Sequence, residues 1–185
     1  ALLLNAVFIL SGAAGLIYES IWSRYLGLFV GHSAYAQIIV LVIFLGGMSL
    51  GAALIGRRSE TVKQPLFWYA AIELACGVVG LVFHDIYGAV TGWAYDSVFP
   101  SLGSLVAVDI VKWTIAALLI LPQSILLGTT FPLMSAGVLR LVRAGGDARA
   151  GRVLSLLYFA NSLGAAGGVL LAGFYLIDAA GLPGT

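Results

Sequence analysis

Five long apolar stretches, separated by short polar segments, limit the possible folds of this chain more than any other feature. A helix that crosses a bilayer needs about 20 mostly apolar residues. Each stretch could supply one, and they cover about residues 2–29, 34–55, 66–83, 105–139 and 153–177. Of the 185 residues, 61% are hydrophobic and 9% are charged, whereas soluble domains carry about 25% charged residues. The sequence predicts an all-α, polytopic transmembrane bundle of about five spans, forming a single domain over residues 1–185.

The segment between the third and fourth stretches, residues 84–104, is less apolar and rich in aromatic side chains. Its aromatic residues include Tyr87, Trp93, Tyr95 and Phe99. Such residues gather at the level of the lipid headgroups, so we predict a short amphipathic helix that lies in the interface.

Two prolines, Pro122 and Pro132, lie inside the fourth stretch. Each removes a backbone donor and favours a bend. We expect one long kinked helix, or a span that ends at Leu121 and continues as a bent segment. Residues 178–185 are expected to form a turn after the last span.

The basic residues are unevenly distributed along the chain. Seven of the nine Lys and Arg residues lie in two polar segments: Arg57, Arg58, Lys63, Arg140, Arg143, Arg149 and Arg152. Basic loops of membrane proteins usually stay in the cytoplasm, so five spans place the amino terminus inside. The net charge of +1, without a basic block, argues against a nucleic-acid partner. The expected surroundings are the lipid bilayer.

Two carboxylates, Glu19 and Glu73, lie inside apolar stretches. A charge in hydrocarbon costs about 3 kcal/mol or more, so such a group usually faces a partner or a watery cavity. We predict that both belong to one internal polar site for a small cation. Tyr18 and Trp22 flank Glu19 and could add cation–π attraction. A bond that only locks two helices remains open for each carboxylate.

Arg24 and Asn161 complete the candidate set. Arg24 has a long stem that could reach the helix interface, where it could also pair with Glu19. Asn161 is expected to hydrogen-bond between helices. The candidate ligand-binding residues are Tyr18, Glu19, Trp22, Arg24, Glu73 and Asn161.

Four glycines are candidates for helix packing. Gly47 and Gly51 form a GxxxG pair, and Gly164 and Gly168 form another. Small residues at this spacing let two helices approach closely.

Signals for catalysis or metal binding are weak. His32 and His84 lie in different turns, without a second ligand at metal spacing. The Ser, His and Asp residues match no nucleophile pattern. We therefore expect no catalytic residue, no metal and no cofactor.

Several segments carry a family resemblance. They are YESIWSR at 18–24, LGGMSLGAALIGRR at 45–58, LLGTTFPL at 126–133, GRVLSLLYFANSLGAAGGVLLAGF at 151–174 and GLPGT at 181–185. In this order they resemble the membrane region of bacterial spermidine synthase-like proteins, in which transporter-like helices are fused to a polyamine aminopropyltransferase-like domain. The segment 45–58 also resembles the end of the second helix in major facilitator transporters. It lacks the aspartate that those transporters place before the basic pair.

The resemblance implies a multi-pass protein of the bacterial cytoplasmic (inner) membrane. A soluble aminopropyltransferase-like domain is not expected within residues 1–185, because no Gly-rich turn follows a strand here. The leading hypothesis is a membrane domain that binds or moves a small polar or cationic molecule, such as a polyamine. The alternative is an accessory subunit that packs against a larger membrane complex or against its own copies. An enzyme that acts alone is the third hypothesis.

Overall fold

The computed structural model describes residues 2–142 and 147–185, and every regular element in these ranges is helical. The long helices are α1 (Leu2–Val30), α2 (Ser33–Ser59), α3 (Pro65–Trp93), α4 (Leu105–Val142) and α5 (Asp147–Leu171). The described part of the chain contains five helical segments that are long and apolar enough to cross a membrane. The protein is an all-α transmembrane bundle.

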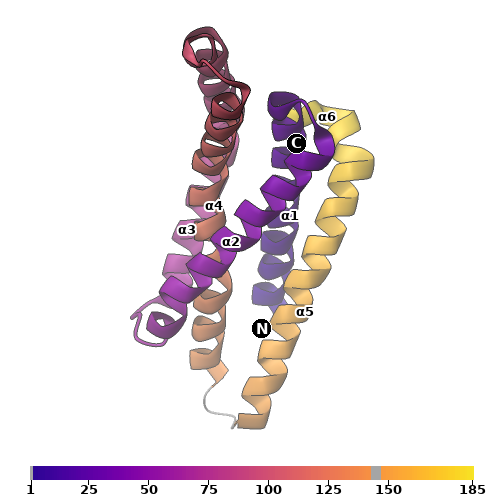
Figure 1. Cartoon of the computed structure of the whole chain (residues 1–185). Helices are drawn as coiled ribbons and strands as arrows, with labels where there is room; N and C mark the ends of the chain where they lie inside the picture. Colours follow the sequence, from indigo (N-terminus) through magenta and orange to yellow (C-terminus); the bar gives the residue numbers. More distant parts are fainter. Residues whose placement is uncertain (1, 143–146) are drawn as a thin grey trace.

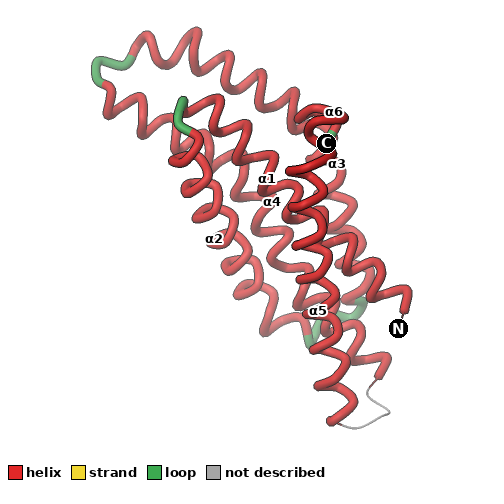
Figure 2. The backbone as a smooth tube through the Cα atoms, turned by 90° about the vertical axis from the view of Figure 1, so that its right-hand side faces the viewer, coloured by secondary structure: helices red, strands yellow, loops and turns green. Residues whose placement is uncertain are grey.

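The five long helices run alternately up and down, and the chain begins and ends toward opposite ends of the bundle (Figure 1). The most extensive contacts join α2 with α4 and α1 with α5, and α3 packs on α4. Figure 2 shows the short loops that join α1 to α2 and α2 to α3. At the first link, Gly31 has a φ of 85°, which glycine adopts without strain, so α1 ends there and the chain reverses.

All four predicted packing glycines lie at helix–helix contacts. A methyl group at Gly51 would overlap the carbonyl oxygen of Ile125 in α4, and one at Gly47 would lie 2.5 Å from the Ser124 side chain. On α5, methyl groups at Gly164 and Gly168 would meet the α1 backbone. The two most extensive helix pairs are therefore built on backbone-to-backbone packing, as small residues permit in membranes.

The predicted separate helix in the interface after Phe83 is not present. Instead α3 continues to Trp93, followed by a π-helical turn (Ala94–Val98) and a 3-10 turn (Phe99–Ser101). The aromatic residues hold this extension along the bundle. Tyr87 donates a hydrogen bond of 2.7 Å to the carbonyl of Tyr25 in α1. Tyr95 donates one of 2.9 Å to the carbonyl of Phe29.

The fourth stretch forms one continuous helix through both prolines, so the alternative of a span that ends at Leu121 is wrong, and the kink stays a prediction. Nearby hydroxyls bond to carbonyls within the helix. Thr129 donates to Leu126 at 2.6 Å, and Thr130 donates to Leu127 at 2.7 Å. These bonds do not go to the carbonyls of Leu118 and Gly128, four residues before each proline, so the packing of neighbouring helices is what lets this helix tolerate proline.

The end of the chain is helical where a turn was predicted. After α5 come a π-helical turn (Ala172–Leu176) and α6 (Ile177–Gly184). A change of direction does occur at Gly181, where φ is 69°. Leu182, next to this bend, packs against the core beside α1.

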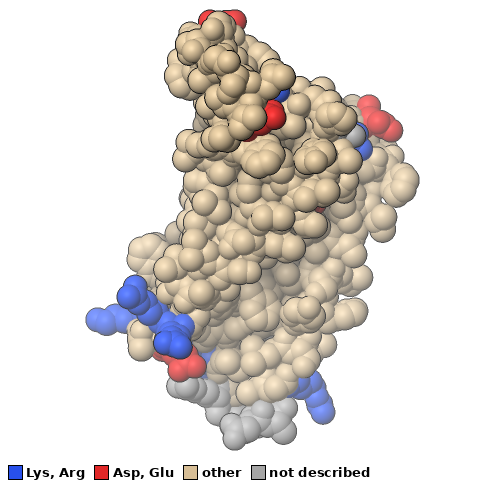
Figure 3. Space-filling model, in the orientation of Figure 1, with Lys and Arg blue, Asp and Glu red and all other residues tan. Residues whose placement is uncertain are grey.

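Lys and Arg side chains gather at the lower end of the bundle (Figure 3). At this end Arg140 donates hydrogen bonds to the carbonyls of Glu60 at 2.6 Å and Lys63 at 3.1 Å, which join α4 to the α2–α3 link. Arg143 lies outside the described residues, and the Arg149 side chain is not described. That this basic end faces the cytoplasm stays a prediction.

Candidate functional site

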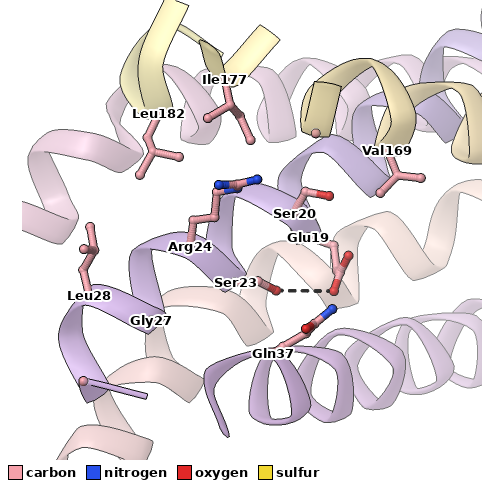
Figure 4. A pocket seen from close by; sticks show the side chains of 12 residues that line it. Glu19, Ser20, Ser23, Arg24, Gly27, Leu28, Gln37, Val169, Ile177 and Leu182 are labelled. Carbon is pink, nitrogen blue, oxygen red and sulfur yellow. Dashed lines mark hydrogen bonds between the residues drawn. The ribbon is translucent and has the colours of Figure 1, made fainter. Parts of the chain in front are cut away.

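A cavity of about 850 Å³ lies between α1, α2 and the carboxyl-terminal segment formed by α5, the π-helical turn and α6 (Figure 4). Its polar lining comes from Glu19, Ser20, Ser23 and Arg24 of α1 and from Gln37 of α2. This volume is in the range of sites that hold small molecules, roughly 300–1,000 Å³. The cavity is therefore the candidate functional site.

The spacing of residues in α1 explains why its polar groups share the cavity. Residues 19, 20, 23, 24 and 27 follow steps of one and three, which keep them on one helix face, and Gly31 follows directly after the end of α1. Two of them, Gly27 and Gly31, carry no side chain and leave room beside Arg24. The polar face of α1 thus opens into the gap that the carboxyl-terminal segment covers.

The rest of the lining includes apolar side chains. Leu28 comes from α1, Val169 from α5, and Ile177 and Leu182 from α6. Apolar walls raise the free energy of any charge that has no partner. Glu19 is half-buried among these side chains, whereas Arg24 is exposed at the edge of the cavity, so the cavity favours a ligand that bears a partner for Glu19 and can also reach Arg24.

Glu19 has little hydrogen bonding from the protein. Among the described residues that line the cavity, one donates a hydrogen bond to Glu19. This donor is Ser23, whose Oγ lies 3.5 Å from Glu19 Oε1 (Figure 4). The donor is four residues away in the same helix, so this bond does not join two helices. Sequence reasoning left open that Glu19 locks a helix pair, and this bond gives no such lock.

The structure brings Arg24 together with Glu19 but does not bring Tyr18 and Trp22 to the cavity. Trp22 is 1% exposed and packs in the core against Phe44 and Phe83. Tyr18 stacks on Trp22 and donates a hydrogen bond of 3.3 Å to the carbonyl of Cys76 in α3. The expected aromatic wall around Glu19 is absent because these rings lie on the adjacent, core-facing side of α1.

Glu73 belongs to a different place. It accepts a hydrogen bond from Ser11 Oγ, and it lines a hollow between α1 and α3 with Tyr69 and Ala70. The cavity around Glu19 and this hollow share no lining residue. The prediction that Glu19 and Glu73 form one polar site is therefore wrong.

Asn161 also lies elsewhere, on α5 against Gly12 of α1, where it lines a smaller cavity of about 190 Å³. Asn161 therefore lies at a contact between two helices, and its hydrogen bond between helices stays a prediction. The residues that sequence reasoning missed at the candidate site are Ser20, Ser23 and Gln37. The periodicity of polar residues along 19–24 could have identified the two serines.

The described residues contain no cluster of three His, Cys, Asp or Glu side chains arranged to hold a metal. Comparison of the chain with protein-family models, curated proteins and solved structures finds no match. Fold and site together define a polytopic helical membrane protein with a polar cavity between its helices. The resemblance to spermidine synthase-like membrane regions stays a prediction.

Proposed function

We propose that this protein is a transporter-like membrane module that binds a small polar molecule with a cationic group in the Glu19 cavity. The observation that carries the proposal is a carboxylate, hydrogen-bonded at 3.5 Å within its own helix, in a cavity of about 850 Å³. Ionisable groups inside membrane spans usually mark a path or site for a substrate or ion.

The position of the cavity supports binding over a purely structural role. A carboxylate that served only to join helices would be expected to bond to a neighbouring helix, as Glu73 does with Ser11. Glu19 instead faces a space that α1, α2 and α6 share. The family resemblance adds a ligand class, because polyamines carry ammonium groups that a carboxylate would bind.

The proposal includes the membrane and its orientation. The resemblance favours the bacterial inner membrane, and the basic end of the bundle favours an amino terminus in the cytoplasm. Glu19 and Arg24 lie in the second half of α1, so in this orientation the cavity is nearer the outer side.

Binding should be measured on the whole chain in lipid nanodiscs by titration calorimetry with putrescine, spermidine and γ-aminobutyrate. Glu19→Gln should weaken the tightest of these ligands about tenfold or more, because a charge-assisted bond is lost. Glu73→Gln is the matched control inside the bundle, and Glu60→Gln is the control on the exposed α2–α3 link. Both controls should keep the affinity of the parent.

Thermal unfolding of each variant would show that the fold is kept. If a well-folded parent bound none of the three ligands, the proposal would be overturned, and the accessory-subunit hypothesis would take its place. Equal loss of affinity in Glu19→Gln and Glu73→Gln would also contradict a site at Glu19.

A further inference from the structure

We propose that the ligand of the Glu19 cavity is a zwitterion, with one ammonium group for Glu19 and one carboxylate for Arg24. This inference rests on the proposed function, because it names the chemical class of ligand for the same cavity. It differs from the expectation of a polyamine, whose groups are all cationic.

The charges of the lining carry the inference. Among the described residues that line the cavity, Glu19 supplies one negative charge and Arg24 one positive charge, and the others are neutral. In apolar surroundings, uncompensated charge is costly. A polyamine would bring more positive charge than Glu19 can neutralise, and Arg24 would repel it. A zwitterion matches both side chains and adds no net charge.

Glu19 and Arg24 are not arranged to neutralise each other. They are five positions apart, which is about 7.5 Å along the helix axis. Favourable side-chain pairs in helices form at spacings of three or four. In Figure 4 the Arg24 side chain extends toward Ile177 and Leu182, whereas the Glu19 carboxylate is turned toward Ser23 and Gln37. The two charges therefore suit opposite ends of one ligand.

The remaining lining fits the rest of such a molecule. Arg24 can bind a carboxylate through two parallel N–H bonds, which a lysine could not do. The hydroxyls of Ser20 and Ser23 and the Gln37 amide can donate or accept further hydrogen bonds. Apolar lining side chains, among them Val169 and Ile177, offer contacts for the carbon skeleton of the ligand.

The test compares each zwitterion with two ligands that lack one of its charges. γ-Aminobutyrate is set against propylamine and butyrate, and 5-aminopentanoate is set against butylamine and pentanoate. Calorimetry on the parent chain in nanodiscs should show one zwitterion binding about tenfold or more tighter than both of its partial analogues. This comparison needs no variant, so it is independent of any effect of mutation on folding.

Two variants then assign the contacts. In Glu19→Gln, the zwitterion should lose its advantage over the carboxylate analogue, whose own binding should not weaken. In Arg24→Gln, the affinity for the zwitterion should fall to that of the amine analogue. The same variant should bind spermidine more tightly than the parent does, because the repulsion from Arg24 is lost.

The outcomes separate the inference from the proposed function. If spermidine bound the parent tighter than both zwitterions and depended on Glu19, the proposed function would stand and the zwitterion would be rejected. Zwitterion binding that was unchanged in Arg24→Gln would also reject it. If no ligand bound the parent, both proposals would fall together.

Discussion

Replacing Gly168 with alanine should push α1 and α5 apart. A methyl group at this position would lie 2.5 Å from the carbonyl oxygen and 2.6 Å from the Cα of Ala13 in α1. Ordinary contact begins at about 3.4 Å, so the nearest separation falls short by about 0.9 Å. Both obstructing atoms belong to the backbone, so no side chain can rotate to make room.

The energetic expectation follows from two opposing effects. Overpacking costs roughly 1–3 kcal/mol, whereas exchanging glycine for alanine inside a helix gains up to about 1 kcal/mol. The neighbouring residue supplies the control, because a methyl group at Gly167 meets nothing within 4 Å. The helix-propensity gain is common to both variants, so it cancels when Gly168→Ala is compared with Gly167→Ala. The first should be less stable than the second by about 1–3 kcal/mol.

Reversible unfolding in mixed micelles, followed by circular dichroism, would measure the two free energies of unfolding. Gly168→Leu, with more bulk, should lower the yield of folded protein further. If both alanine variants unfolded with the same free energy, the close approach of α1 and α5 at Ala13 would be refuted, and Gly168 would have to face lipid.

Two further predictions concern topology and the extension of α3. The labelling experiment uses a background in which the buried Cys76 is replaced by serine. Because positions 61 and 104 are both exposed, the variant Thr61→Cys should react with an impermeant thiol reagent only from the cytoplasm, and Ser104→Cys only from outside. The opposite pattern would reverse the orientation. Tyr87→Phe should cost about 1 kcal/mol in the free energy of unfolding, because its hydroxyl bonds to a carbonyl of α1 at 2.7 Å. The exposed Tyr175→Phe is the control, and equal stability of these two variants would count against that bond.

Sequence alone determined the number of spans and the glycine contacts. The thickness of the hydrocarbon core fixes how many apolar residues a span needs, so the length of each stretch was enough. The spacing of Gly47 with Gly51, and of Gly164 with Gly168, was informative because only small residues allow helix backbones to touch.

Only the tertiary structure decided which side chains share a site. In a soluble helix, polar residues mark the outer face, but here both lipid and protein neighbours are apolar, so the pattern does not fix the rotation of α1 about its axis. That rotation buries Trp22 in the core and turns Glu19 and Arg24 toward the cavity, while Glu73 bonds to Ser11 elsewhere. Likewise, the aromatic residues after Phe83 suggested the membrane interface. Hydrogen bonds from Tyr87 and Tyr95 to carbonyls of α1 hold that segment as part of α3 and its terminal turns, because contacts between distant residues fix where a helix ends.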